Sequence, residues 1–435
     1  MIVKSGRAGL HGGPDAVIGR GEAGADLSVD DMRAIVEQAL ETVPAGSRVL
    51  AVISDRTRDD NTPELFPLIS RALAARGALQ LDALVAQGTH VVMNDADKRA
   101  KIGAGLGSIP LLGTIFDHHW DRDSELTTLG TISADEIGAE TGGLLRQSVS
   151  IRLNAHLSPG QYDVVLVVGA TVPHEVAGFA GGAKYFFPGV AGPELTHLTH
   201  WLGALATIER VIGRVETPTR HLIEKAATFV PSPVIAFTSV STRDERGFKT
   251  RALFAGDLRA TVRQAAAISQ QVHVRYTGRR YKRVVALLDE HYDELWVGGK
   301  ASYKLGSIIE RGGELVIYAP HLSAISLTHG ALIEKYGYAP LERVRDMVEG
   351  SDELRANLCV AAHLAHVAYA GDRGNDGVVV PRYRITLAAN LSKEICRKVN
   401  LDYMDMRTFD VRNYANDPDT LVVHNAGRDL YLEKP

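Results

Sequence analysis

The chain has 435 residues, more than a single hydrophobic core usually supports, so two domains are expected. Hydrophobic residues at 45% and charged residues at 23% are typical of a globular protein and exclude a disordered or fibrous chain. The formal net charge of -4, from 48 basic and 52 acidic residues mixed along the chain, gives no basic surface, so neither nucleic acid nor an anionic membrane is expected as a partner.

The beginning of the chain lacks the apolar core of a signal peptide, and no segment approaches the roughly 20 apolar residues that a membrane span requires. We therefore expect a cytoplasmic protein. The two cysteines, Cys359 and Cys396, have neither the spacing of metal ligands nor the density of a disulfide framework. Both are expected to be reduced and buried.

The first part of the chain alternates between helical and strand patterns. Ser28 and Asp31 have the spacing of a capping box in front of an amphipathic run, and the run after it is rich in Val and Ile. The predicted elements are a helix at 31–43, a strand at 48–55, a helix at 65–77, strands at 79–88, 163–170 and 233–240, and a helix at 258–276. Strands separated by helices indicate a largely parallel sheet.

A polar, basic stretch at 277–283 is interpreted as a domain boundary, and a second series follows it. Its elements are strand-like segments at 293–299, 307–313 and 314–320, a helix at 341–350 and a strand at 382–389. We therefore predict an α/β protein with two domains, residues 1–278 and 279–409, each with a largely parallel sheet. A tail at about 410–435 would pack back on the first domain, and the cleft between the domains is the expected binding place.

Two polar segments follow predicted strands, at the carboxyl ends where doubly wound sheets bind their ligands. In SDRTRDDNTP, Asp55, Thr57 and Arg58 bring a carboxylate, a hydroxyl and a guanidinium to the edge of the sheet, where Arg58 could bind a carboxylate or phosphate. In QGTHVVMND, His90 has a position suited to proton transfer near neutral pH. Taken alone, the first segment also fits a solvated turn, and the second a surface histidine.

The richest segment is GATVPHEVAGFAGGAKYFFPGVAG at residues 169–192, called the glycine-rich segment below. Its glycines, among them Gly178, Gly181 and Gly182, would let backbone N–H groups approach an anion closely. It contains neither GxxxxGK followed by Ser or Thr nor the GxGxxG fingerprint of common nucleotide loops. Lys184, which follows His174 in this segment, could be a covalent anchor, a Schiff-base nucleophile or an anion ligand.

Further along, ELTHLTHWLG places His197 and His200 on one face of a predicted helix. Two histidines at this spacing can share a metal ion, or they can lie on a polar helix surface. No HExxH, Cys-rich or paired-carboxylate zinc signature occurs in the sequence to indicate an all-protein metal site.

In their order and spacing, SDRTR, GTH, PHEVAGFAGGAKYFFPGV and His200 resemble the lactate racemase family, over about the N-terminal two-thirds of the chain. The resemblance implies an isomerase that inverts C2 of a small 2-hydroxy acid. It implies a nickel-pincer nucleotide (pyridinium-3-thioamide-5-thiocarboxylic acid mononucleotide nickel) bound by the first domain, held covalently on Lys184, with His200 as the protein ligand of nickel. The implied partners are the hydroxy acid and the enzymes that make the cofactor.

The resemblance also implies roles for the polar residues. His90 and His174 would be the two acid/base groups, one on each face of C2, because hydride transfer to the cofactor leaves a planar 2-keto acid that can be reduced from either side. Asp55 would orient one histidine and Arg58 would bind an anion. Thr57 would lie near the cofactor phosphate, together with the glycines of the glycine-rich segment.

The second domain departs from the family pattern. The usual Tyr-Gln pair followed by a lysine is replaced in GGKASYKLGS by Tyr303 and Lys304, and a tryptophan expected later in the chain is absent. Lys300 or Lys304 would pair with the substrate carboxylate. Because these features line the substrate side, a larger substrate, such as a sugar acid (aldonate) epimerised at C2, is the alternative to a small hydroxy acid.

Two other functions stay open from the residues alone. Lys184 could be the nucleophile of a Schiff-base lyase acting on a carbonyl substrate. The chain could also be a binding module that kept the fold without the activity, although the presence of all the polar residues named above disfavours this interpretation.

Overall fold

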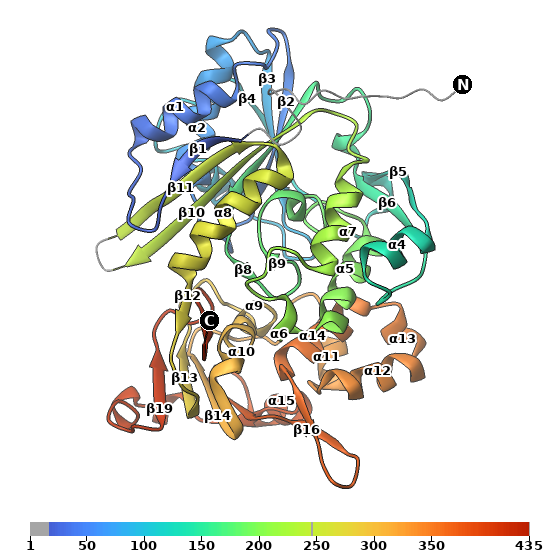
Figure 1. Ribbon diagram of the computed structural model, residues 1–435, viewed down its shortest axis with the longest axis vertical. Coiled ribbons are helices and arrows are strands. Elements are labelled where there is room, and N and C mark those ends of the chain that lie inside the picture. The colour runs from blue at the N-terminus through green and yellow to red at the C-terminus, as the bar shows by residue number, and fades with distance from the viewer. Residues whose placement is uncertain (1–16, 245–246, 435) are drawn as a thin grey trace. The chain divides into compact units, whose positions relative to one another are not determined.

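The structure is a computed structural model that describes residues 17–244 and 247–434. The chain divides into two compact units, each with its own sheet (Figure 1). Of the described residues, unit 1 holds 17–172, 179–196, 220–244 and 247–272, and unit 2 holds 173–178, 197–219 and 273–434. The prediction of an α/β protein with two domains and largely parallel sheets is confirmed. The predicted domain limits stay a prediction.

Unit 1 contains a seven-stranded sheet with the order β1-β11-β10-β7-β2-β3-β4. The strands are β1 (Val17–Gly21), β2 (Arg48–Ser54), β3 (Gln80–Ala86), β4 (Leu112–Phe116), β7 (Val164–Ala170), β10 (Val234–Asp244) and β11 (Gly247–Gly256). From β4 to β10 all neighbours are parallel, and β11 and β1 add an antiparallel edge. The central strands β2 and β7 are almost wholly buried, as their Val- and Ile-rich sequences predict.

Helices cover both faces of this sheet. Leu253 and Ala255 of β11 belong to the core that contains α1 (Val29–Ala39) and α2 (Thr62–Ala75), whereas Ala252 and Phe254 pack with Ala265 of α8 (Leu258–His273). Because successive side chains of a strand point to opposite faces, α1 and α2 lie on one face of the sheet and α8 on the other. Figure 1 shows α8 crossing in front of β10 and β11.

Several helix ends differ from the prediction, among them the ends of α1 and α8. The capping box is present, since the Asp31 N–H donates to the Ser28 hydroxyl, but α1 ends at Ala39 rather than at residue 43. Pro44 disfavours a helical conformation at Val43, the residue directly before it, where the predicted helix would have ended. At the end of α8, the predicted helical residues 274–276 instead form strand β12 (Val274–Tyr276), which pairs with β20 (Leu430–Leu432). Tertiary pairing overrides the local helical pattern there.

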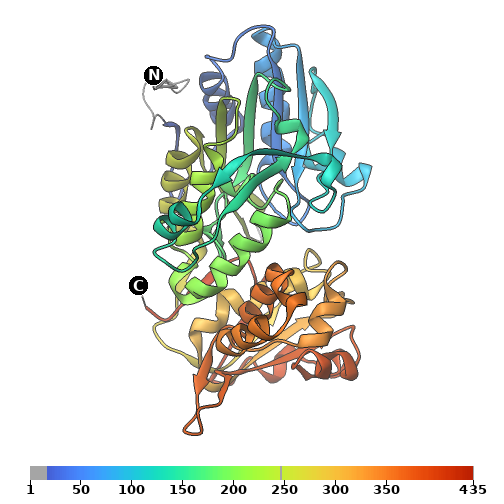
Figure 2. The same cartoon turned by 90° about the vertical axis from the view of Figure 1, so that its right-hand side faces the viewer.

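Unit 2 contains a five-stranded, all-parallel sheet with the order β18-β17-β14-β13-β19. Figure 2 shows the strands and helices of the C-terminal part of the chain in yellow-orange to red. The strands are β13 (Tyr281–Leu287), β14 (Ile309–Ala319), β17 (Arg384–Ala389), β18 (Asp402–Tyr403) and β19 (Thr420–Val423). The segments predicted separately at 307–313 and 314–320 form the single strand β14, which passes through Gly312 at a φ of 75°. The prediction of a strand at 293–299 is wrong, because this segment forms the short helix α9 (Leu295–Gly298).

The remaining helices and short strands lie along the chain between the strands of these two sheets. The helices are α3 (Asp95–Lys101), α4 (Ala134–Glu140), α5 (Pro193–Ala206), α6 (Ile208–Val211), α7 (Pro218–Ala227), α10 (Lys300–Leu305), α11 (Gly330–Tyr336), α12 (Leu341–Gly350), α13 (Asp352–Arg355), α14 (Leu358–Ala368) and α15 (Lys393–Lys398). The short strands are β5 (Leu126–Ile132), β6 (Val149–Asn154), β8 (Pro173–His174), β9 (Gly178–Phe179), β15 (Gly371–Arg373) and β16 (Val379–Pro381). Within residues 17–244 and 247–434, none of the helices has the length and apolar character that crossing a membrane requires.

Candidate active site

The topology of unit 1 marks one place in its sheet for a ligand. From β2 the chain continues to β3 and β4 on one side, and then returns to β7 on the other side of β2. In open parallel sheets, ligands bind at such a reversal, outside the carboxyl ends of the strands. The segments that leave β2 and β3 at this edge are the two polar segments identified in the sequence, and the segment that leaves β7 is the glycine-rich segment.

The first two of these segments meet through a carboxylate and a histidine. The Asp55 Oδ2 atom lies 2.6 Å from Nδ1 of His90. The other carboxylate oxygen of Asp55 accepts hydrogen bonds from the Thr57 N–H at 2.9 Å and from the Thr57 hydroxyl at 2.5 Å. Arg58 then donates to the Thr57 hydroxyl oxygen at 3.2 Å. The structure therefore brings Asp55, Thr57, Arg58 and His90 into one hydrogen-bonded group.

This arrangement holds Asp55 as an anion. Burial alone would raise the pKa of the Asp55 carboxyl group, but His90, the Arg58 guanidinium and the Thr57 hydrogen bond outweigh it and keep that pKa well below its usual range. An ionised carboxylate only accepts hydrogen bonds, so the proton of a neutral His90 must sit on Nδ1. Nε2 of His90 then carries a lone pair, which is the form of imidazole that can remove a proton.

A buried ion pair fixes the segment that carries Asp55 and Arg58. Lys101 of α3 donates to an oxygen of Asp60 at 2.9 Å and to the backbone carbonyl of Arg58 at 2.8 Å. The second oxygen of Asp60 accepts from the Ser54 hydroxyl at 2.6 Å. Side chains on α3 and at the end of β2 thus clamp the turn between them, so the Asp55 carboxylate is presented in one position.

Lys184 stands out within the glycine-rich segment. Between Val176 and Gly192, every residue of which the structure describes, only Lys184 is partly exposed and all the others are buried. Gly181 and Gly182 precede it with φ values of 90° and 58°, and a Cβ on Gly182 would lie 2.6 Å from a methyl carbon of Val262. Only glycine fits this conformation and this close packing. The backbone therefore enters the short helical turn at Gly182–Tyr185 in a way that leaves the Lys184 side chain partly exposed.

Hydrogen bonds connect the end of the glycine-rich segment to the segment of His90. The Gly88 N–H donates to the Gly189 carbonyl at 2.9 Å, and Nε2 of His118 lies 3.0 Å from the Ala191 carbonyl. The Gln87 side chain donates to the His118 carbonyl at 2.9 Å. Burial lowers the pKa of His118 to about 4, so this histidine bridges the two segments as a neutral group.

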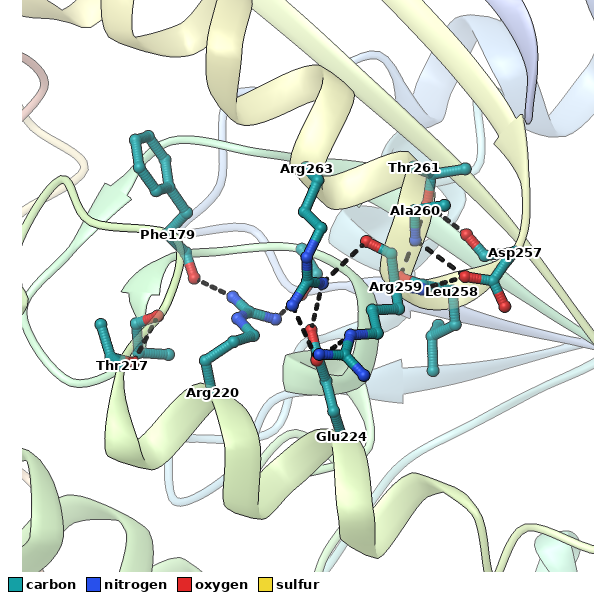
Figure 3. A network of polar contacts seen from close by, with 12 residues as sticks. Phe179, Thr217, Arg220, Glu224, Asp257, Leu258, Arg259, Ala260, Thr261 and Arg263 are labelled. Atoms are coloured by element: carbon teal, nitrogen blue, oxygen red, sulfur yellow. Dashed lines mark hydrogen bonds and ion pairs between the residues drawn. The ribbon is translucent and has the colours of Figure 1, made fainter. Parts of the chain in front are cut away.

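A buried arginine holds the other end of the glycine-rich segment. Arg220 of α7 is 0% exposed and donates to the Gly181 carbonyl at 3.0 Å and to the Phe179 carbonyl. Figure 3 shows the Arg220 guanidinium directed toward Phe179, with Glu224 between Arg259 and Arg263 nearby. Glu224 pairs with these two arginines at 3.0 Å and 3.1 Å. The backbone on which Lys184 stands is thus fixed by side-chain donors.

In unit 2, the predicted histidines have backbone partners or lie near other aromatic groups. Nδ1 of His174 accepts from the Val176 N–H at 3.1 Å. Nδ1 of His197 accepts from the Cys359 N–H at 3.3 Å. His200, one turn further along α5, lies within electrostatic reach of the buried His363. Gly178 has a φ of 80° and accepts from the Gly213 N–H at 2.9 Å.

The residues predicted to bind substrate are engaged within unit 2. The Tyr303 hydroxyl lies 2.9 Å from Nδ1 of His363, and Lys304 is 3% exposed and donates to the backbone carbonyl of Arg428. The ammonium group of Lys300 lies 5.7 Å from the centroid of the Tyr292 ring. Their role toward a substrate stays a prediction.

Comparisons with known proteins show what the part of the chain that carries this site is similar to. Residues 32–211 match the lactate racemase N-terminal domain. This part of the chain is therefore similar to the N-terminal domain of lactate racemases. The resemblance expected from the sequence motifs is thereby confirmed, and the segments that carry Asp55, His90, Lys184 and His200 all lie inside the matched range.

Solved structures extend the likeness beyond that domain. A protein from Thermotoga maritima is similar with a TM-score of 0.86 and 29% identity, over 94% of this chain and 99% of that chain. The lactate racemase apoprotein from Thermoanaerobacterium thermosaccharolyticum is similar with a TM-score of 0.66 and 16% identity, over 95% of this chain and 99% of that chain, which shows a common fold. A search of curated proteins found no match.

The described residues also bear on how a metal could be held. Among residues 17–244 and 247–434, no group of three or more His, Cys, Asp or Glu side chains is placed to hold a metal ion. A nickel ion at His200 would therefore need most of its ligands from a bound group. The partly exposed Lys184 amine, next to the close-packed Gly181 and Gly182, fits the attachment of such a group.

Three residues that shape the site were missed by sequence reasoning. Lys101 and Arg220 lie far along the chain from the segments that they hold, and no motif marks either of them. Glu175 follows His174 directly, and the sequence motifs assign no role to it. A signal existed for Glu175, because a carboxylate beside a candidate catalytic histidine is a recurrent way to orient the imidazole.

Proposed function

We propose that this protein is a 2-hydroxy acid racemase or epimerase that uses a nickel-pincer nucleotide carried on Lys184. The coarser statement, that the chain contains a racemase-family domain, rests on the family match. The finer statement rests on one observation above all. His90, held as a base by Asp55, lies on a segment that is hydrogen-bonded to the segment bearing the partly exposed Lys184.

The residues present fit the cofactor that the family implies. Lys184 would hold it through an amide-like bond, and His200 would be the protein ligand of nickel. The Thr57 hydroxyl and Arg58 guanidinium, which share a hydrogen bond, would bind its phosphate or the anionic end of the substrate. When bound, this group supplies an acceptor and donor of hydride, the chemistry that no side chain of the protein offers.

The chain's own residues would move the protons. Nε2 of His90 takes the proton of the C2 hydroxyl group, and the Asp55 carboxylate stabilises the imidazolium that results. His174 serves the opposite face of the planar keto acid by returning a proton to its oxygen. Two histidines are needed because inversion requires hydrogen to return to the other face of C2, and a keto acid that has turned this face to the hydride donor points its oxygen to the other side of the site.

The experiment compares the protein made with and without the cofactor-making enzymes. We expect co-expression to raise the intact mass by one cofactor at Lys184, and the loaded protein to interconvert the C2 stereoisomers of a hydroxy acid in a panel of small 2-hydroxy acids and aldonic acids. Chiral chromatography reads the products. A substrate deuterated at C2 should keep its label in ordinary water, because the hydrogen moves as hydride and is not exchanged.

Two controls decide between the candidate functions. Lys184→Arg should abolish loading and turnover, whereas Lys225→Arg, on the surface of α7, should change neither. Turnover of aldonic acids alone would assign the sugar-acid alternative. A borohydride-stabilised adduct between a carbonyl substrate and Lys184 would support the Schiff-base lyase instead. An unmodified Lys184 after co-expression, without turnover of any acid, contradicts the proposal.

A further inference from the structure

The two histidines of the proposed reaction differ in what holds their Nδ1 atoms. Nδ1 of His90 meets a carboxylate, Asp55, at 2.6 Å. Nδ1 of His174 accepts the Val176 N–H at 3.1 Å and lies 3.6 Å from the Oε2 atom of Glu175. A distance of 3.6 Å is too long for a hydrogen bond, but it is within the range of an ion pair.

These partners place the protons differently. Because the Val176 N–H is a donor, Nδ1 of a neutral His174 must be the acceptor, and its proton therefore sits on Nε2. A neutral His90 has the opposite tautomer, with the proton on Nδ1. His90 at rest can take a proton at Nε2, whereas His174 at rest already carries one there.

We propose that Glu175 is a positioning residue that stabilises His174 as an imidazolium, so that His174 acts as the proton donor opposite to His90. This inference rests on the proposed function for its use in catalysis, but the pairing itself belongs to the protein without cofactor. When His174 takes up a second proton, Nδ1 becomes a donor and can no longer accept from Val176. A small turn of the Glu175 side chain then supplies the acceptor.

The surroundings of Glu175 support a charged pair. The side chains of His174 and Glu175 are 8% and 12% exposed, so solvent weakens their attraction little. The titratable groups in electrostatic reach of Glu175 within unit 2 include Tyr303 on α10 and His366 on α14. Burial raises the pKa of Tyr303 well above its usual range and lowers the pKa of His366 to about 4, so both are neutral at pH 7. Neither of these two neighbours therefore competes with the His174 imidazolium for the Glu175 carboxylate.

The proton balance of the step is simple. The imidazolium of His174 gives its Nε2 proton to the oxygen of the keto acid as hydrogen returns to C2. The N–H bond breaks, an O–H bond forms, and His174 becomes neutral while Glu175 remains a carboxylate throughout. His90, in the same turnover, has gained the proton that the first hydroxyl group lost, so the two histidines exchange protonation states.

Nuclear magnetic resonance of the cofactor-free protein tests the pairing directly. The full chain is labelled with ¹⁵N-histidine, and the signals of His90 and His174 are assigned from their loss in His90→Gln and His174→Gln. At high pH, we expect the Nδ1–H tautomer for His90 and the Nε2–H tautomer for His174. Glu175→Gln should lower the pH midpoint at which His174 becomes an imidazolium by about one pH unit, because the neighbouring negative charge is removed.

Matched variants separate the pair from a general structural effect. Glu209→Gln, which alters a different carboxylate of unit 2, should leave the His174 midpoint unchanged. Glu175→Asp keeps the negative charge and should therefore keep the His174 midpoint close to that of the unaltered protein. An unchanged or raised midpoint in Glu175→Gln, or an Nδ1–H tautomer for neutral His174, overturns the inference. In the loaded enzyme, the pH profile of kcat/KM should move with the midpoint. If the midpoint moves and the profile does not, the pair stands and the role of His174 in the proposed reaction is wrong.

Discussion

Asp55→Asn removes the charge that sets the state of His90 and leaves the shape of the side chain almost unchanged. The introduced carboxamide keeps an oxygen to accept the Thr57 N–H, but it now presents an NH₂ group to Nδ1 of His90. That nitrogen must become the acceptor, and the proton of the neutral ring moves to Nε2. The variant thus holds His90 in a tautomer that cannot take a proton from a hydroxyl group.

The size of the effect follows from what is lost. The 2.6 Å contact between Asp55 and His90 is a charge-assisted hydrogen bond to a carboxylate that is 4% exposed. An equivalent Asp-to-Asn change in the Ser-His-Asp triad lowers kcat by about 10⁴ through the same change of tautomer. We expect kcat/KM to fall by about 10³ to 10⁴, which corresponds to about 4–5 kcal/mol of transition-state stabilisation.

The assay is the interconversion of C2 stereoisomers by protein whose cofactor content has been measured by intact mass. Loading should be unchanged in Asp55→Asn, since Lys184 is not altered. Asp59→Asn is the control, because Asp59 lies on the same segment but pairs with Arg243. Loaded Asp55→Asn with activity within about threefold of the unaltered protein, a difference of less than about 1 kcal/mol, would refute the assignment of His90 as a base held by Asp55.

Three further predictions concern the side chains that hold the site. Lys101→Met should lower the free energy of unfolding by about 3–5 kcal/mol in chemical denaturation, because it leaves the buried Asp60 carboxylate without its cation. Asp60→Asn in the same chain should recover part of this loss. If the losses of the two single variants simply add in the double variant, the pairing is contradicted. Arg220→Met should speed amide hydrogen exchange at residues 179–187, whereas Arg263→Met should leave it unchanged, and equal exchange in both variants argues against the clamp. The pKa of His118 is about 4 in the folded chain and about 6.5 in the unfolded chain. The unfolded chain therefore binds a proton first as the pH falls from 6.5 to 4, and the folded chain loses up to about 3 kcal/mol of stability over this range. The melting temperature of His118→Gln should depend less on pH than that of the unaltered chain.

The sequence was a good guide wherever a local pattern decides the outcome. The strands at 48–55, 79–88 and 163–170 lie within two residues of β2, β3 and β7, because buried Val- and Ile-rich runs between helices have few other solutions. The rule that parallel strands present their carboxyl ends at one edge then brings Asp55 and His90 together. Local pattern and topology suffice for this part of the site.

Local pattern does not suffice where a long-range partner decides. Residues 274–276 continue a helical pattern, yet they form β12 because β20, near the end of the chain, pairs with them. The pairs Lys101–Asp60 and Arg220–Gly181 join α3 and α7 to segments about 40 residues away, and neither helix sequence shows that its cation is buried. Burial of a charge is a property of the folded neighbourhood, which a single sequence does not display.

The buried cations of unit 1 are difficult to explain as contributions to stability alone. Replacing a buried ion pair by well-packed apolar side chains often leaves the stability of a protein unchanged or raises it. Burying Lys101 and Arg220 therefore costs more stability than apolar side chains would at the same positions. Each donates to a backbone carbonyl, of Arg58 and of Gly181 respectively, and these are the two segments that present Arg58 and Lys184. A charge-assisted donor fixes a carbonyl in distance and direction, which an apolar contact does not. These two cations therefore hold the segments of the site in fixed positions. The proposed reaction requires this, because the group on Lys184 and the base at His90 must be placed to within a fraction of an ångström of each other's productive geometry.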